Sequence, residues 1–327
     1  MSTLRWAVVA ADDDPGRAEW TQAAHAAGVP EPRFVSWRSV IAEEAEFQPA
    51  EHVIYGRLEG WAPSNPVGGQ AERFREFTEA VERLDLAAVK AGAPLVAAAS
   101  STVLLLDRVG RDEHLREHGL PILDGPDPES NRLGIIRSRY TASDDWIIDG
   151  WHTQLFPHRA RTGFEVWRNP ADTSVGPSNL RQVLSLLEPH GVYARAELHR
   201  AYLCGRFHDL RFEVVDGKVT HAAGVLREEV RARPWYGGRR RELDNFVERF
   251  GSERWQRLVA LAERTAALFP DIRSLGVDLI VDNREAEYVF DVDPFGADLP
   301  GLLGLPDTVG AGLSVRAGVL RALSAES

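Results

Sequence analysis

The sequence predicts an α/β protein that begins with a parallel α/β domain and continues as α+β over its C-terminal two thirds. Short apolar runs alternate with helix-length segments in the first hundred residues, and two hairpin patterns occupy the last third. The 44% apolar and 27% charged fractions are those of a folded globular chain. A length of 327 residues is enough for two or three domains.

The pattern of residues 1–98 predicts a Rossmann-like domain in which strands alternate with helices. Its expected strands are short apolar runs, at residues 6–10, 34–37, 52–55 and 94–97. Helices are expected over 18–27 and 71–90, because apolar residues recur there at helical spacing. This order favours a parallel sheet, which binds ligands at the carboxyl ends of its strands. The loops at 12–16 and 57–69 are expected at that edge.

Residues 99–192 are expected to form a central subdomain. Residues 104–118 have a helical pattern that closes at Gly119. The Pro- and Gly-rich stretch 124–128 is typical of a hinge, and one further helix is predicted over 179–188.

Residues 193–327 form the third expected unit, which contains two β-hairpins and two helices. Asp216 and Gly217 supply the positive φ angles of a two-residue turn between the strands of the first hairpin. These strands cover 207–215 and 218–226, and those of the second hairpin cover 275–281 and 287–292. The helices are expected over 253–268 and 307–323.

The second hairpin carries the sharpest candidate site. Asp278 interrupts an apolar strand, while Asp291 and Asp293 are two residues apart and share one face. If residues 283–286 form a four-residue loop, Asp278 lies opposite Asp291 and Gly276 lies opposite Asp293. Three converging carboxylates favour a bound cation, and ligands that are all oxygen suit Mg²⁺ that bridges substrate phosphates. A solvent-facing polar face without metal is the alternative.

The first hairpin places Asp209, Arg211 and Glu213 on one strand face. The two-residue turn predicts small residues opposite them, Ala222 and Gly224. An arginine with small cross-strand neighbours is able to reach a bound anion. The alternative is a solvated charged face of an antiparallel sheet.

Charge and composition exclude several classes of function. The formal net charge of −11 argues against nucleic-acid binding, whereas residues 195–241 carry ten arginines and one lysine against six acids. This contrast favours a small anionic ligand such as a nucleotide. The single cysteine, Cys204, excludes an intramolecular disulfide. With no apolar run near the roughly 20 residues of a membrane span and no targeting segment, we expect a cytoplasmic protein.

The order of these features resembles the ATP-grasp superfamily, especially its glutathione-synthetase and ribosomal-protein glutamate ligase branch. Residues 276–280 and 290–296 are similar to its magnesium-binding strands, with Asp in place of Glu and Asn. Residues 209–211 resemble the strand whose arginine faces the reacting phosphoryl group. Arg108 and Arg137 stand where the family carries phosphate-binding lysines. A closer resemblance is to an uncharacterised bacterial ATP-grasp-like group, through residues 233–240 and 295–302.

The resemblance implies an ATP-grasp fold that uses ATP and Mg²⁺ to ligate a carboxylate to an amine through an acyl phosphate. The substrates would be a small-molecule acid and amine, or a peptide, in bacterial biosynthesis, and a homodimer is expected. The implied roles are metal ligands for Asp278, Asp291 and Asp293, nucleotide binding for Arg108, Arg137 and Asp209, catalysis for Arg211, and acid-substrate binding for Arg227 and Arg233.

One departure from the family pattern keeps other functions open. Residues 138–145 contain no glycine where the family has a glycine-rich phosphate loop. A binding module that holds a ligand without turnover is therefore an alternative, and so is a phosphotransferase that uses the same metal set.

Overall fold

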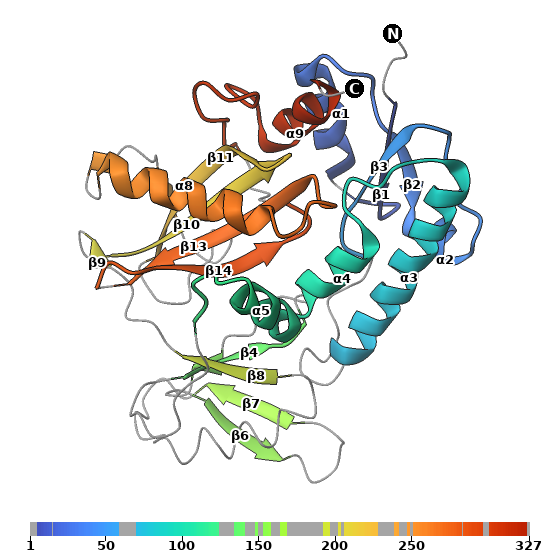
Figure 1. The fold of residues 1–327 in the computed structure, drawn as a ribbon. Coiled ribbons are helices and arrows are strands. Elements are labelled where there is room, and N and C mark those ends of the chain that lie inside the picture. Colours follow the sequence, from blue (N-terminus) through green and yellow to red (C-terminus); the bar gives the residue numbers. More distant parts are fainter. Residues whose placement is uncertain are drawn as a thin grey trace.

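The computed structural model of the chain (Figure 1) describes residues 5–14, 16–58, 70–123, 134–140, 148–149, 153–157, 164–168, 192–196, 202–203, 206–227, 239–241, 247–248, 251–282, 284–296 and 301–325. Within them, an N-terminal parallel sheet lies beside a larger antiparallel sheet, and two small antiparallel sheets lie beyond helix α5 (Arg108–Glu117). The mixed α/β class predicted from the sequence is confirmed.

The N-terminal sheet has the parallel pairing that the sequence predicts. Its strand order is β2 (Arg33–Ser36), β1 (Arg5–Ala10), β3 (Glu51–Tyr55). The helices of this unit are α1 (Gly16–Ala27), α2 (Trp37–Ile41) and α3 (Gln70–Ala91). The short α2 was not expected; the Ser36 hydroxyl caps it by accepting a hydrogen bond from the Ser39 amide at 3.1 Å. The strand expected at 94–97 is only a single bridge, between Leu95 and Val53.

The helix predicted over 104–118 is two helices, α4 (Ala99–Leu106) and α5, separated at Asp107. Asp107 is extended, with φ −86° and ψ 95°, and forms a β-bridge with Tyr140. Its carboxylate accepts a hydrogen bond from the Val109 amide at 3.2 Å, which caps α5. A contact with a distant segment therefore breaks the helix where the apolar pattern continues.

The large sheet carries the two predicted hairpins. Its strand order is β12 (Arg239–Arg241), β11 (Lys218–Arg227), β10 (Arg206–Val215), β13 (Ser274–Val281), β14 (Glu287–Asp293), with β9 (Tyr202–Leu203) also paired to β10. Helix α8 (Ser252–Ala266) runs along one face of this sheet (Figure 1). Alternate strand residues such as Phe212 and Val277 pack into the same buried core as Leu258 and Leu261 of α8. The opposite face carries Arg211 and Asp278, and also the apolar Ile280, which packs with Leu123.

The last helix, α9 (Val315–Ala325), begins eight residues later than the predicted 307. Turns occupy the intervening segment, in which Asp307 and Gly312 have positive φ angles of 62° and 70°. Helix α9 packs against α1, and Leu320 shares a buried cluster with Trp6 and Ala24. This contact brings the C-terminal segment onto the N-terminal unit (Figure 1).

The remaining strands form two small sheets. One has the order β5 (Ile148–Asp149), β4 (Gly134–Ser138), β8 (Val192–Ala196), and the other pairs β6 (Thr153–Pro157) with β7 (Phe164–Arg168). The predicted hinge at 124–128 and the predicted helix at 179–188 lie outside the described residues. In the part of the chain that the structure describes, every helix is too short or too polar to cross a bilayer.

Candidate functional site

The polar face of the large sheet brings the predicted carboxylates and Arg211 into two adjacent rows. In one row Arg211 of β10 lies opposite Asp278 of β13, which lies opposite Asp291 of β14. The neighbouring row is, in the same strand order, Glu213, Gly276 and Asp293. The pairings predicted for Asp278 with Asp291 and for Gly276 with Asp293 are both confirmed.

The turn end of that hairpin differs from the prediction by one residue. Glu287 pairs with Val281, and a β-bulge between Asp278 and Leu279 restores the expected register toward the site. The bulge leaves Phe290 as the extra residue of β14. Because a bulge adds one residue to one strand, it redirects the side chains beyond it. The carboxylates therefore share a face through a local irregularity that alternation alone does not reveal.

The first hairpin has the predicted turn but a shifted register. Asp216 and Gly217 have φ angles of 47° and 75°, as a two-residue hairpin turn requires. A bulge beside Glu213 then moves the pairing by one residue. The predicted partners Ala222 and Gly224 are therefore wrong: Arg211 lies opposite Ala223, and Asp209 lies opposite Val225. Asp209, expected to bind nucleotide, is a buried residue of β10.

Asp291 is held by two arginines of α5. Nη2 of Arg108 lies 3.5 Å from Oδ2 of Asp291, and Nη1 of Arg111 donates to Oδ1 of the same carboxylate. The Arg111 side chain is only 1% exposed and also donates to Asp112, at 2.8 and 3.0 Å. Burial lowers the pKa of Arg111, but the charges of Asp112 and Asp291 outweigh it, so the pKa lies above its ordinary value. Arg111 is fully charged at every relevant pH.

Arg211 connects the other two carboxylates. Its Nε lies 3.6 Å from Oδ1 of Asp278, and its Nη2 lies 3.4 Å from Oδ2 of Asp293. Nη2 also donates to the carbonyl of Gly296 at 3.3 Å. Burial lowers the pKa of Arg211, whereas the nearby carboxylates, Asp278 first, raise it above the ordinary value.

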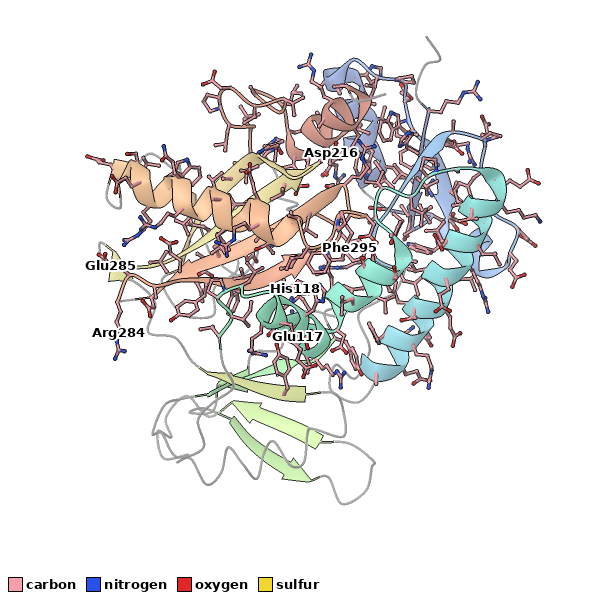
Figure 2. All side chains as sticks on the ribbon, in the orientation of Figure 1. Glu117, His118, Asp216, Arg284, Glu285 and Phe295 are labelled. Carbon is pink, nitrogen blue, oxygen red and sulfur yellow. The ribbon has the colours of Figure 1, made fainter. Side chains whose placement is uncertain are left out.

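A fourth arginine reaches the site from the N-terminal unit. Arg57 follows β3 at the carboxyl end of the parallel sheet, and its Nη2 donates to Oδ2 of Asp293 at 3.1 Å. Its guanidinium also lies over the ring of Phe295, 5.6 Å from the ring centre. Figure 2 labels Phe295 where the large sheet meets the N-terminal unit. The loop at 57–69 was expected at the ligand edge of this sheet, and its first residue lies beside the carboxylates.

Glu213 places a further carboxylate in the row of Asp293. Its side chain is completely buried, and the Ser274 hydroxyl donates to Oε1 at 2.5 Å. A Cβ atom at Gly296 would lie 2.9 Å from Oε2 of Glu213. The chain therefore has room for this carboxylate only because position 296, with φ +80°, is a glycine.

The remaining predicted site residues are only partly within the described residues. Arg137 lies in β4 and Arg227 ends β11, but their side chains are outside the described residues, as is the whole of Arg233. Arg57 and Arg111 were not among the predicted site residues. For Arg57 the available signal was its position directly after a strand of the parallel sheet. For Arg111 it was the spacing of three from Arg108 on one helix.

The oxygen atoms of Asp278, Asp291 and Asp293 are suitable ligands for Mg²⁺, but these carboxylates are paired with arginines. Oxygen ligands on one sheet face are the donors that Mg²⁺ prefers. Among the residues that the structure describes, however, no three His, Cys, Asp or Glu side chains are gathered as a metal site. Each of Asp278, Asp291 and Asp293 instead forms at least one ion pair with an arginine.

Solved structures share this architecture along the full chain. D-cycloserine synthetase DcsG has a TM-score of 0.58 and 15% identity, with 98% of this chain and 99% of that chain covered. The ATP-grasp ligase PsnB, complexed with its minimal precursor, has a TM-score of 0.57 and 15% identity, with 100% of both chains covered.

A third similar structure is N5-carboxyaminoimidazole synthase from Aspergillus clavatus, in complex with ADP and 5-aminoimidazole ribonucleotide. It has a TM-score of 0.54 and 12% identity, with 99% of this chain and 78% of that chain covered. Another PsnB structure, with a TM-score of 0.54, contains Mg and ADP. No protein-family model and no curated protein sequence matches the chain. The likeness is one of three-dimensional structure, and it shows that the chain has the ATP-grasp fold.

Proposed function

We propose that this protein is an ATP-dependent ligase that joins the carboxylate of one substrate to the amine of another. The likeness to PsnB, an ATP-grasp ligase, over the whole chain supports a ligase in general. The substrates are a small-molecule acid and amine or a peptide, in a reaction of bacterial biosynthesis in the cytoplasm. The division into units 1–98, 99–192 and 193–327 is part of the proposal, as is a homodimer.

The observation that carries the proposal is the position of Arg211 between Asp278 and Asp293. A guanidinium that faces carboxylates on one sheet face has the charge to bind a transferring phosphoryl group once a metal neutralises those carboxylates. Asp278, Asp291 and Asp293 would hold Mg²⁺, which when bound lowers the charge repulsion among the phosphates. Arg108, Arg137 and Asp209 would bind the nucleotide, and Arg227 and Arg233 the acid substrate.

The proposed reaction has two balanced steps. An oxygen of the acid substrate attacks the γ-phosphorus of ATP and displaces ADP, which gives an acyl phosphate. The amine nitrogen then attacks the acyl carbon, loses a proton and displaces phosphate. In this chain Arg211 orients the phosphoryl group during the first step. Asp278, Asp291 and Asp293 would hold the phosphates only through a bound cation, because carboxylates and phosphates repel each other. The arginines of α5 contact the same face at Asp291.

A second function, a binding module without turnover, is favoured by one observation. Every carboxylate of the triad formed by Asp278, Asp291 and Asp293 is already paired with an arginine. If these pairs persist when nucleotide is bound, no metal is held and no phosphoryl group moves. The absence of glycine from residues 138–145 supports the same alternative.

A thermal-shift titration with Mg-ATP and Mg-ADP tests nucleotide binding. A ligand at 100 times its Kd adds about 2.7 kcal/mol of stability, and no shift with either nucleotide would contradict the ligase. Release of phosphate from ATP, and the mass of the product, then separate ligation from phosphorylation and from binding alone.

A pair of variants assigns that activity to the carboxylate face. Asp278→Asn is expected to abolish phosphate release with the fold retained, because Asp278 is a partly exposed residue of a sheet face. The control is Glu285→Gln, which lies at the far end of the same hairpin (Figure 2) and pairs with Arg254 at 2.7 Å. Unchanged phosphate release in Asp278→Asn would refute the proposed role of this face.

A further inference from the structure

The triad Asp278, Asp291 and Asp293 is paired with arginines from three parts of the chain. Arg57 comes from the end of β3, and Arg211 lies within the sheet itself. Two more, Arg108 and Arg111, come from α5. Asp112, which shares Arg111, and Glu213, in the row of Asp293, add two carboxylates, so that five carboxylates face four guanidinium groups. The arginines therefore cancel most of the negative charge of the cluster.

Burial makes these pairs strong on the α5 side and weaker on the β3 side. The side chains of Arg108 and Arg111 are 3% and 1% exposed, so water screens their attraction to Asp291 poorly. Arg57 is half exposed, and its pair with Asp293 is correspondingly easier to separate. A dication that approached the triad alone would have to displace buried guanidinium groups and leave them without counter-charges, which is strongly unfavourable.

We infer that the four arginines hold the triad in a metal-free state, and that the divalent cation enters only together with a polyphosphate that takes over the arginines. In this exchange phosphate oxygens replace the aspartates as guanidinium partners, and the cation replaces the guanidinium groups as the partner of the aspartates. Each aspartate of the triad and each of its arginines thereby keeps a partner of opposite charge. The inference rests on the proposed function, because it concerns how the same face takes up a metal nucleotide.

The exchange makes cation and nucleotide binding strongly coupled. If ADP raises the affinity for the cation by some factor, the cation must raise the affinity for ADP by the same factor. A preformed carboxylate site would behave differently, since it would bind the cation in the absence of nucleotide. The affinity for the cation with and without nucleotide therefore distinguishes the two arrangements, and no turnover has to be measured.

The test is a titration of the full-length protein with Mn²⁺, a paramagnetic substitute for Mg²⁺, in which electron paramagnetic resonance measures the free ion. The wild-type protein is expected to bind Mn²⁺ at least ~10-fold more tightly with saturating ADP than without it, a coupling of ordinary allosteric size. Isothermal titration with ADP, with and without Mn²⁺, is expected to give the same factor.

Two variants show whether the arginines cause the coupling. Arg57→Gln removes an exposed partner of Asp293 and is expected to raise the affinity for Mn²⁺ alone by about two- to fivefold, the range for an exposed ion pair. Arg108→Gln removes a buried partner of Asp291 and is expected to raise it further. The matched control is Arg73→Gln, whose partner Glu76 lies on α3, away from the triad. It should leave Mn²⁺ affinity unchanged.

The outcomes separate the inference from the proposed function. Tight binding of Mn²⁺ to the wild-type protein without ADP would overturn the inference and leave the ligase proposal standing. The same conclusion would follow if the Arg57→Gln variant bound Mn²⁺ alone no better than the wild-type protein does. Failure of ADP to bind under any condition would overturn the proposed function. If Arg108→Gln does not fold, Arg57→Gln decides the question, because its exposed side chain contributes little to stability.

Discussion

Arg111 of α5 and Asp291 of β14 form an ion pair between residues 180 positions apart in the sequence. The pair joins α5 to β14 at the candidate site. Because Arg111 also binds its neighbour Asp112, a single buried guanidinium balances two carboxylates. The position of α5 over the sheet therefore depends on charges that also define the site.

Replacement of Arg111 by methionine is expected to lower the free energy of unfolding by about 3–5 kcal/mol, since it removes the buried guanidinium that Asp112 and Asp291 share and leaves Asp291 with the longer Arg108 pair. Urea denaturation measures the change. The control is Arg73→Met, which removes the exposed pair with Glu76 and is expected to cost less than about 1 kcal/mol. Equal losses of unfolding free energy in the two variants would show that the buried Arg111 pair stabilises the fold no more than the exposed Arg73 pair does.

Replacement of Arg211 by lysine is expected to lower ATP-dependent phosphate release by about 10²–10³-fold, the usual cost of removing one group that stabilises developing charge. A single ammonium group is unable to reproduce the fork that contacts both Asp278 and Asp293. Arg257→Lys is the control, because Arg257 is exposed and pairs with Glu287 at the distal end of β14. A rate for Arg211→Lys within threefold of the wild-type rate would contradict the assigned role, because it corresponds to a change of only about 0.7 kcal/mol in activation free energy.

The predictions that held depend on local signals. Asp216 and Gly217 determine a turn by their own conformational preferences, and period-two alternation places Asp291 and Asp293 on one face. The bulges beside Glu213 and Asp278 were not predicted, because no residue type marks them. They depend on how neighbouring strands twist and pack. The first decides which residue of β11 lies opposite Arg211, and the second decides which residue of β14 lies opposite Asp278.

The parts of the site that were not predicted from the sequence depend on contacts between distant segments. Arg57 and Arg111 are two of 36 arginines, and composition does not distinguish them from the rest. Only the fold brings them to Asp293 and Asp291. The break between α4 and α5 is similar, because Asp107 leaves helical geometry to bridge Tyr140 and to bind Arg139 at 2.6 and 2.8 Å.

The stability of the protein is expected to fall as the pH drops below 6.5, partly through His221. Burial lowers the pKa of His221, and its hydrogen bonds to the backbone of Leu313 and Ser314 offset this only in part. The unfolded chain therefore binds the proton first. This histidine contributes its full stability above pH 6.5 and loses it as the pH falls, by at most about 1.4 kcal/mol per pH unit.

Melting temperatures between pH 7.5 and 5.5 test this contribution. His221→Gln is expected to flatten the pH dependence relative to that of the wild-type protein. His52, whose pKa is lowered by burial and by the charge of Arg273, contributes in the same direction. An unaltered slope in His221→Gln would refute the assignment.

Addition of a methyl group at Gly318 is expected to loosen the contact between α9 and the large sheet. A Cβ atom there would lie 2.4 Å from Cε1 of His221, whose Nε2 is 3.1 Å from the carbonyl of Leu313 and whose ring is completely buried. Overpacking of this kind costs about 1–3 kcal/mol, from which the better helix propensity of alanine recovers about 1 kcal/mol. Gly318→Ala should therefore unfold at lower urea concentration, while Gly56→Ala, where no atom lies within 4 Å, should not. Since the loss comes from the ring, His221→Ala in the same chain should remove most of the penalty, and a purely additive double variant would disprove the steric cause.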